Sequence, residues 1–393
     1  MREVVVIGVG LHNWGKFPDK TVTEMSRVVV TQALEDAGME WKEVEEVMAG
    51  IWIYGGGSGF NPGAALTGIM GDIGIPTVNI YNMCATSTNC FRVAYNSVAS
   101  GARDVVLAVA ADKSPSGFLT VLGRPDPTDP DCIRWAMTGM TNPGYWAIDL
   151  RKRMEEFGTT ERHLAKAKVA SSKFGALNPR ALFRKVYTEE EVLSSPMVCD
   201  PLRLLMVCAT RDGAAAAILC SADKARKYTR KPVIVAGVGE GSSLYGDPTA
   251  RMGFISEPAK GTAPILSESY AASQAAYKTS GIGPEDIDFV ELPDNSSWHY
   301  LQYPETLGFW GPGETDKMLD EEQTFLGGKL PINTSGGIAS FGEATSANGL
   351  AQIYEVVVQL RGEAGERQVQ GAKAGMTQTY GMGGNSGSVI MKV

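Results

Sequence analysis

Histidine and cysteine are scarce in this chain, and long apolar runs are absent. Among its 393 residues are three histidines and six cysteines, none of them arranged as a Cys-x-x-Cys pair. We therefore expect no metal site in this chain. No uninterrupted apolar segment is long enough to span a membrane, and the N-terminus leads directly into a strand rather than a signal peptide. These absences predict a cytoplasmic protein with free thiols.

Basic charge is limited too. Lysine and arginine together number 36 against 44 acidic residues, so the formal net charge is −8. A nucleic-acid partner is disfavoured, because such binding needs a strongly basic face. The residues that are present, 44% hydrophobic and 20% charged, are typical of a globular protein that buries a large core.

The sequence contains an internal repeat. Residues 2–10 (REVVVIGVG) are echoed by residues 231–239 (KPVIVAGVG), and each copy is followed by a helix-length segment that ends at a glycine, Gly38 or Gly281. An acidic, strand-forming segment follows each glycine. Alternating strands and helices predict largely parallel or mixed sheets with helices packed on them. We therefore expect an α/β fold of two similar halves.

The alternation lapses between residues 115 and 200, where Pro/Asp-rich turns precede a helical stretch over residues 143–173. This segment is interpreted as an inserted loop domain, residues 115–200. The first half then comprises residues 1–114 and 201–229, and the second half comprises residues 230–393.

The inserted segment has a local excess of basic residues in an acidic protein. Such an excess suits an anionic ligand such as a phosphate, but solvated helix faces produce the same pattern, so both interpretations stay open. The residues are Arg151, Lys152, Arg153, Arg162, Lys166, Lys168, Lys173, Arg180, Arg184 and Lys185.

Cys84 is the most informative single residue. It lies where an extended run over residues 77–81 changes into a helical pattern of apolar residues. Free amides at a helix N-terminus lower a thiol pKa and bind the oxyanion that forms when sulfur attacks a carbonyl. The hydroxyls of residues 86–88 are candidates for capping this helix. We interpret Cys84 as a nucleophile; the alternative is a buried structural cysteine.

Glu343 is the one carboxylate in a loop of small residues, 336–349, that precedes a helical pattern. Burial would raise its pKa toward neutrality and make it a candidate base beside a thiol. The alternative is a carboxylate that favours a helix start through the macrodipole.

Polar groups follow the strand predicted near residues 289–292. Asn295 and His299 are the best placed of them, because ligands of α/β proteins bind at the carboxyl edge of the sheet. A second glycine cluster, residues 381–387, includes Gly383 and permits close approach of a ligand to the backbone, although tight turns use glycines equally.

Several motifs together resemble the thiolase superfamily over essentially the whole chain. They are Asn82-Met-Cys-Ala, Arg211-Asp-Gly-Ala-Ala-Ala-Ala, Leu330-Pro-Ile-Asn-Thr-Ser-Gly-Gly and the terminal glycine-rich loop. The chain is most similar to the branch with the sterol-carrier-type and archaeal enzymes and the thiolase subunits of 2-benzoylsuccinyl-CoA thiolases.

This resemblance implies a fold, a ligand and an assembly. The fold is the thiolase fold, with two duplicated βαβαβαββ-type halves in five αβαβα layers and an inserted loop domain. Cys84 would be the acylated nucleophile. Coenzyme A would bind as a co-substrate over the inserted domain, with Thr210, Arg184 and Lys185 in contact with it. The resemblance also implies a homodimer and no covalently bound cofactor.

The departures from the family pattern affect the proton-transfer groups. Two positions that ordinarily carry histidine fall in Pro293-Asp-Asn-Ser296 and Gly342-Glu-Ala344, and no cysteine follows Cys220. The usual second thiol is thus missing. We expect Glu343 to face Cys84, Asn295 to donate a hydrogen bond or hold a water, and the amides of Cys84 and Gly383 to bind the oxyanion.

The implied activity is thiolytic cleavage of a β-ketoacyl-CoA. Retro-aldol cleavage of a β-hydroxyacyl-CoA is an alternative, because a sister group of aldolases shares this fold. That group uses tyrosines where this chain has Pro293 and Thr345, so the aldolase reaction is disfavoured. A non-catalytic acyl-CoA-binding subunit is the other alternative. Members of this thiolase branch and of the sister aldolase group work with a small OB-fold protein bearing a zinc ribbon. The resemblance therefore implies such a partner here.

Overall fold

The computed structural model describes residues 2–52, 56–115, 128, 139, 141–228, 231–244 and 265–393. Its strands are β1 (Val4–Leu11), β2 (Glu46–Gly50), β3 (Thr77–Ile80), β4 (Val105–Lys113), β5 (Met197–Cys199), β6 (Leu202–Arg203), β7 (Asp212–Ser221), β8 (Val233–Ser242), β9 (Phe289–Glu291), β10 (Ala374–Gly381) and β11 (Asn385–Lys392).

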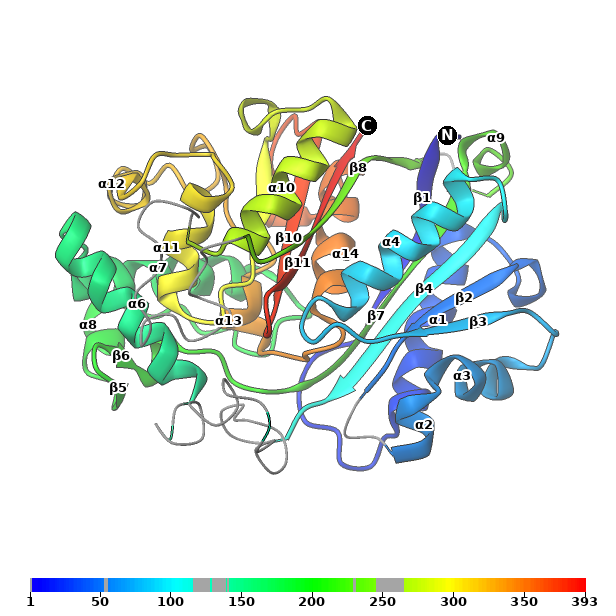
Figure 1. Cartoon of the computed structure of the whole chain (residues 1–393), viewed down its shortest axis with the longest axis horizontal. Coiled ribbons are helices and arrows are strands. Elements are labelled where there is room, and N and C mark those ends of the chain that lie inside the picture. The colour runs from blue at the N-terminus through cyan, green and yellow to red at the C-terminus, as the bar shows by residue number, and fades with distance from the viewer. Residues whose placement is uncertain are drawn as a thin grey trace.

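The α-helices alternate with these strands (Figure 1). They are α1 (Val22–Ala37), α2 (Gly56–Phe60), α3 (Pro62–Met70), α4 (Thr86–Ala99), α6 (Asn142–Phe157), α7 (Glu161–Leu177), α8 (Glu189–Leu193), α9 (Ala222–Ala225), α10 (Ser267–Ser280), α11 (Ser297–Thr306), α12 (Glu314–Asp320), α13 (Gly337–Phe341) and α14 (Asn348–Leu360).

The duplication predicted from the sequence is confirmed by the strand pairing. The strand order is β3-β2-β4-β7-β1-β8-β11-β10-β9. In the first half β1 pairs antiparallel with β7 and β2 pairs parallel with β4; in the second half β8 pairs antiparallel with β11 and β9 pairs parallel with β10. The two sets of strands join through a short contact, Val5 with Ile234 and Val6 with Val233.

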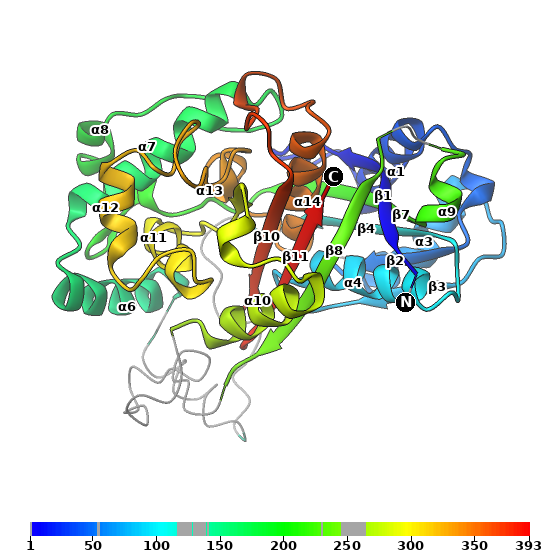
Figure 2. The ribbon, with the colours of Figure 1, turned by 90° about the horizontal axis from the view of Figure 1, so that it is seen from above.

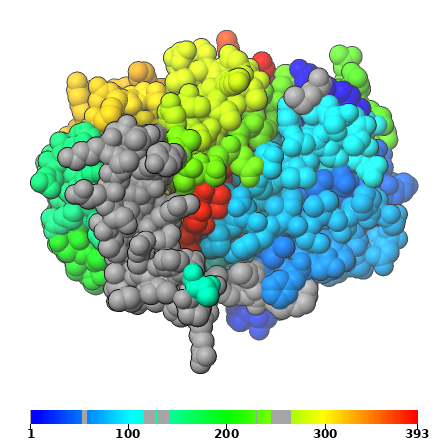
Figure 3. Space-filling view, viewed as in Figure 1, coloured from blue at the N-terminus to red at the C-terminus, as the bar shows by residue number. Residues whose placement is uncertain are grey.

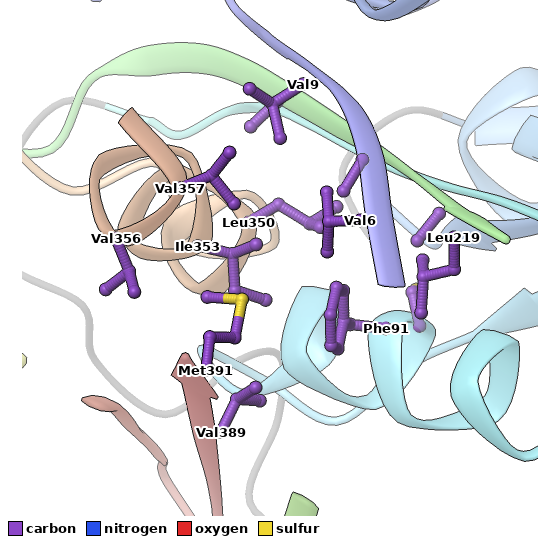
Figure 4. Packing of buried hydrophobic residues seen from close by; sticks show 14 of the residues in the cluster. Val6, Val9, Phe91, Leu219, Leu350, Ile353, Val356, Val357, Val389 and Met391 are labelled. Carbon is purple, nitrogen blue, oxygen red and sulfur yellow. The ribbon is translucent and has the colours of Figure 1, made fainter. Parts of the chain in front are cut away.

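Helices cover both faces of these strands in layers. One hydrophobic cluster lies between α1 and the first half, and another lies on the outer side of the second half, where α10 packs. The central layer consists of α4 and α14, which lie between the two halves. Figure 4 shows side chains from both helices and both sets of strands meeting there: Val6, Phe91, Leu219, Leu350, Ile353 and Met391.

The repeated Gly-Val-Gly sequence has one physical cause in both halves. A Cβ atom on Gly10 of β1 would lie 2.0 Å from the carbonyl oxygen of Val29 in α1. A Cβ atom on Gly239 of β8 would lie 2.0 Å from the carbonyl oxygen of Ala272 in α10. The first helix of each half therefore packs so closely on its strand that only glycine fits.

The helices of the inserted segment gather with α11 and α12 to one side of the strands (Figure 2). The helical stretch predicted over residues 143–173 consists of two helices, because α6 ends before Gly158 and α7 starts at Glu161. Gly158 has φ 75°, a left-handed conformation that ends a helix readily when the residue is glycine. The predicted Pro/Asp-rich turns near residues 124–131 lie, apart from residue 128, outside the described residues.

Candidate active site

The N-termini of the two central helices meet at one place. The amide of Leu350 in α14 donates to Ser87 Oγ in α4 at 3.1 Å. A Cβ atom on Gly349 would lie 2.1 Å from Thr88 Oγ1, so a larger residue cannot occupy this position. This contact brings the turn that precedes α4 next to the loop that precedes α14.

Cys84 lies in the tight turn between β3 and α4. The amide of Ala85 donates to the carbonyl of Asn82 at 3.0 Å, and that of Thr86 donates to the carbonyl of Met83 at 3.1 Å. Met83 has φ 49°, a left-handed conformation that costs roughly 1–2 kcal/mol for a non-glycine residue. The turn holds Cys84 at the end of the strand, where it remains partly exposed.

The predicted capping of α4 by residues 86–88 is wrong, because no side chain caps this helix. Thr86 Oγ1 instead braces the turn: it accepts from the Asn82 amide at 2.8 Å and donates to the Met83 carbonyl at 2.6 Å. Ser87 and Thr88 bond to the second half of the chain. These hydroxyls therefore fix the turn and join the halves.

Glu343 is held by its backbone in the loop between α13 and α14. Its amide donates to the carbonyl of Ala209 at 2.8 Å, and its carbonyl accepts from the amide of Arg211 at 2.7 Å. The preceding residue, Gly342, has φ 85°, and a Cβ atom there would lie 2.8 Å from the Ala209 oxygen. The segment before β7 thus sets the position of the carboxylate.

The Glu343 carboxylate contacts two thiols. Cys84 Sγ donates to Oε1 at 3.0 Å, across 259 residues of sequence, and Cys208 Sγ donates to Oε2 at 3.7 Å. Asn295 Nδ2 donates to Cys208 Sγ at 3.8 Å. Glu343, Asn295 and Cys208 are 3%, 7% and 8% exposed, so bulk water does not compete for these contacts.

Burial governs the titration of this cluster. It raises the pKa of the Cys84 thiol well above its ordinary value, and the Glu343 charge adds to this effect. The expectation that the helix N-terminus lowers that pKa is therefore wrong, because loss of water and a neighbouring carboxylate outweigh the helix amides. Burial also raises the pKa of Glu343, although hydrogen bonds from Cys84, Asn295 and Cys208 oppose it. The arrangement suits transfer of the thiol proton from sulfur to the carboxylate.

Two members of this cluster were not expected from the sequence. The family pattern predicts a second thiol only after Cys220, whereas Cys208 precedes it; its place just before the Arg211 motif is the sequence signal for it. Asp112, at the end of β4, accepts from the amide of Ser346 at 2.8 Å. Burial raises the pKa of Asp112 to about 7, and Glu343 acts in the same direction.

His299 is not part of the site. Its Nδ1 lies 2.9 Å from Ser296 Oγ, and its ring packs against Trp146 and Trp298 in the core. Burial lowers the pKa of His299 to about 3, so it stays neutral. The interpretation of His299 as a site residue is therefore wrong: α11 turns it into the core, whereas Asn295, before that helix, reaches Cys208 and Glu343.

Gly383 lies in the hairpin between β10 and β11, exposed and with φ 95°. A Cβ atom on the nearby Gly381 would lie 2.7 Å from the carbonyl oxygen of Asn82, so this hairpin approaches the Cys84 turn. Figure 3 shows the C-terminal segment, in red, reaching the surface between yellow-green and light-blue segments. The hairpin is thus next to the turn, as the proposed oxyanion role of Gly383 requires.

The residues expected to contact coenzyme A lie in different settings. Thr210 is buried beside the Glu343 backbone, and its Oγ1 donates to the carbonyl of Pro115 at 2.5 Å. Arg184 and Lys185 are exposed, and Lys185 pairs with Glu191 at 2.6 Å. Only Thr210 is therefore close to the cluster around Glu343.

Much of the basic excess in the inserted segment forms ion pairs within the protein. Arg151 pairs with Asp200, Arg162 with Glu189 and Lys166 with Asp320. Arg153 is almost fully buried and donates to Glu305 and Asp316, each at 2.8 Å. The positive charges of these four residues therefore pair with carboxylates of the same chain.

The Arg153 network provides a test of stability. We expect Arg153→Met to lower the free energy of unfolding by about 3–5 kcal/mol, because it leaves two carboxylates buried without their cation. Arg151→Met is the matched control: its pair with Asp200 is 52% and 59% exposed, so its loss should cost at most about 1 kcal/mol. Urea unfolding monitored by circular dichroism measures both; equal effects would contradict the assignment.

Within the described ranges, no group of three or more His, Cys, Asp or Glu residues is arranged to hold a metal ion. In the same part of the chain, every helix is too short or too polar to cross a membrane.

The duplicated α/β scaffold thus places the Cys84 sulfur, at a strand-to-helix turn, in contact with the Glu343 carboxylate. Residues 4–114 match the family "Thiolase, N-terminal domain", and residues 260–392 match "Thiolase C-terminal domain-like". Acetyl-CoA acetyltransferase of Methanothermobacter thermautotrophicus is 35% identical over 99% of both chains. The chain belongs to the thiolase family, in the branch with the archaeal and sterol-carrier enzymes, and is an acyl-CoA acyltransferase.

Other relatives extend this comparison. Sterol carrier protein 2 of Bos taurus is 32% identical over 98% of this chain and 71% of its own length. Benzoylsuccinyl-CoA thiolase subunit BbsB of Thauera aromatica is 28% identical over 97% of this chain and 95% of its own. The solved structure "Ltp2-ChsH2(DUF35) aldolase" has the same fold, with a TM-score of 0.84 at 24% identity over 100% of this chain and 98% of that one.

Proposed function

We propose that this enzyme cleaves a β-ketoacyl-CoA by thiolysis through an acyl-Cys84 intermediate. The observation that supports this proposal is the 3.0 Å contact between Cys84 Sγ and Glu343 Oε1 at the end of β3. A thiol is activated as a nucleophile when an adjacent base takes its proton.

In the first half-reaction Glu343 takes the Cys84 proton and the sulfur attacks the ketone carbon. The amides of Cys84 and Gly383 bind the resulting oxyanion, a contribution of roughly 3–4 kcal/mol per donor. The carbon–carbon bond then breaks, the acyl group stays on Cys84, and the leaving acyl-CoA enolate takes the proton from Glu343 directly or through a water held by Asn295.

In the second half-reaction Glu343 takes the proton of free CoA, the CoA sulfur attacks the thioester, and the proton returns to Cys84.

As substrate we propose 2-benzoylsuccinyl-CoA, which thiolysis would convert with CoA to benzoyl-CoA and succinyl-CoA in anaerobic toluene degradation. The similarity over nearly the full length of both chains to a protein named benzoylsuccinyl-CoA thiolase subunit supports this choice. The coenzyme would lie over the inserted segment, where Thr210, Arg184 and Lys185 are the proposed contacts. The abundance of free thiols among the described cysteines suits the reducing cytoplasm.

We propose two protein partners. A second copy of the chain would pair along β3, the edge strand of the sheet, where Val78 in the strand and Tyr81 directly after it are exposed apolar residues. A small OB-fold protein with a zinc ribbon would complete the acyl-CoA site. The structural neighbour is named "Ltp2-ChsH2(DUF35) aldolase", and the two components in that name support a second subunit here.

The proposal is tested by intact-mass measurement of the denatured protein after incubation with β-ketoacyl-CoA thioesters, without free CoA. We expect one acyl group per chain on Cys84, and its loss when CoA is added. Aromatic and aliphatic thioesters compared in parallel test the substrate, and co-purification tests the zinc protein. Retro-aldol cleavage would proceed without CoA and leave no acyl group on the protein, and this outcome would refute thiolysis.

A further inference from the structure

Glu343 presents a physical difficulty as a base. A carboxyl group that is 3% exposed is driven toward its neutral form, and Asp112 adds a second acidic group nearby. A neutral Glu343 cannot take the proton of Cys84. The groups around it must therefore favour the ionised form.

Besides Asp112 at the end of β4, four groups from four other segments face Glu343. Cys84 from the α4 turn, Asn295 from the loop before α11, Asn348 from α14 and Cys208 from the loop before β7 all lower the pKa of its carboxyl, whereas burial raises it. Cys84 is the proton donor in the reaction, so its hydrogen bond is not an independent support for the ionised carboxylate. Cys208 occupies the other carboxylate oxygen, Oε2, at 3.7 Å.

Cys208 is itself fixed from two sides. Its amide donates to the backbone carbonyl of Asn295 at 2.8 Å, and its sulfur accepts from Asn295 Nδ2 at 3.8 Å. Burial and the Glu343 charge raise the pKa of the Cys208 thiol well above its ordinary value, so it keeps its proton and can donate it to Oε2.

A small cavity lies behind Cys208. Its volume is about 10 Å³, room for about one water molecule, and its polar lining comprises Lys168, Ser171, Cys208, Asp294, Ser296 and Ser297. Lys168 is only 6% exposed. Its Nζ donates to the carbonyl of Ala339 at 2.7 Å, and among the described residues no carboxylate lies within ion-pairing distance of it. Burial lowers the pKa of Lys168 to about 8 and Asp294 opposes this, while Nζ also lies 5.4 Å from the centroid of the Tyr187 ring. A positive charge is therefore present beside the cavity near neutral pH.

We propose that Cys208 is a positioning residue that, supported by Lys168 across this cavity, keeps Glu343 ionised and aimed at Cys84. The inference rests on the proposed role of Glu343 as base. Cys208 supplies the ionised carboxylate with a hydrogen bond that does not come from the reacting thiol, and Lys168 supplies positive charge on the far side of Cys208. Asp294, which accepts from Ser171 Oγ at 2.9 Å, limits the field of that charge.

The test follows the rate at which iodoacetamide alkylates Cys84 as a function of pH, which needs no substrate. We expect Cys208→Ala to move the acid limb of this profile to higher pH. Alkylation at a fixed pH on that limb should then become about tenfold slower. Cys208→Ser retains a donor and should shift the limb much less. A role in packing alone would lower stability without moving the limb.

Lysine variants separate charge from packing. Lys168→Met should shift the acid limb in the same direction as Cys208→Ala, and Lys168→Arg should restore the native profile because the charge is kept. Lys173→Met, on the exposed face of the same helix, is the control and should leave the profile unchanged.

Native profiles for both Cys208→Ala and Lys168→Met would overturn the inference, as would a Cys208→Ser variant as impaired as Cys208→Ala. Failure of the proposed function is a separate result: it would appear as absence of acyl-Cys84 in the native protein while these alkylation profiles still shift.

Discussion

Cys84→Ala is expected to lower kcat for thiolysis by roughly 10⁴-fold or more, because removal of a nucleophile that acts together with its base eliminates most of the catalysis. Cys84→Ser should be nearly as inactive, since a serine hydroxyl beside Glu343 is a far weaker acid than a thiol. The rate of CoA consumption with purified protein measures the loss. The same variants should show no acyl group by intact mass.

Cys90→Ala is the matched control for this experiment. Cys90 lies in α4 only six residues after Cys84 and is fully buried in the central layer, where it serves packing. Its truncation should lower stability modestly and leave turnover near the native value. Near-native thiolysis by Cys84→Ala would remove Cys84 from the mechanism and favour a reaction without a covalent intermediate.

The duplicated fold was predictable because its signal is local and repeated. Residues 2–10 and 231–239 share the same pattern, and in each copy a glycine lies under the first helix because a Cβ atom would collide with that helix's backbone. The repeated strand and helix pattern was therefore enough to predict two similar halves. The helical stretch over residues 143–173 is divided at Gly158, and a glycine within a helical pattern is the stop signal that marks this division.

The candidate site was only partly predictable. Cys84 carries a local signature, a strand that changes abruptly into a helix, but its contact with Glu343 spans 259 residues and follows from how α4 and α14 pack. The resemblance to a family supplied that pairing, whereas periodicity alone could not. The only local signal for Cys208 is its place just before the Arg211 motif, since its role depends on the loops of Asn295 and Glu343 meeting around it.

Charge patterns were the least reliable guide. Arg153 and Lys168 contribute equally to the basic excess in the sequence, yet both are buried, one in an ion-pair network and one beside a small cavity. The same limitation applies to the Cys84 pKa, which was expected to fall because of the helix N-terminus. Burial depends on the tertiary fold. It decides whether a basic residue faces solvent or the core, and it decides the direction in which the Cys84 pKa shifts.

Glu343→Gln is expected to slow acylation of Cys84 by about 10²–10⁴-fold near neutral pH, the range for loss of a general base. Glutamine keeps the size of the side chain and can still contact both thiols, so the loss reports the proton-accepting function. Rapid-quench measurement of acyl-Cys84 in a single turnover gives the rate. Glu363→Gln, in an exposed pair with Lys231, is the control and should act like the native protein.

The pH dependence of Glu343→Gln distinguishes a base from a mere negative charge. Burial raises the Glu343 pKa above 4.5, so native acylation should decline as pH falls toward that raised value, and the variant should lose this limb because glutamine does not titrate. The Glu343 charge also raises the Cys84 pKa, so its removal should lower that pKa and make alkylation of the variant faster than native at alkaline pH. Loss of the base slows the variant near neutral pH, whereas the lower Cys84 pKa makes it faster at alkaline pH. The pH–rate profiles of the variant and the native protein should therefore cross. A variant that equals or exceeds the native protein at every pH would show that Glu343 only restrains the thiol and takes no proton from it.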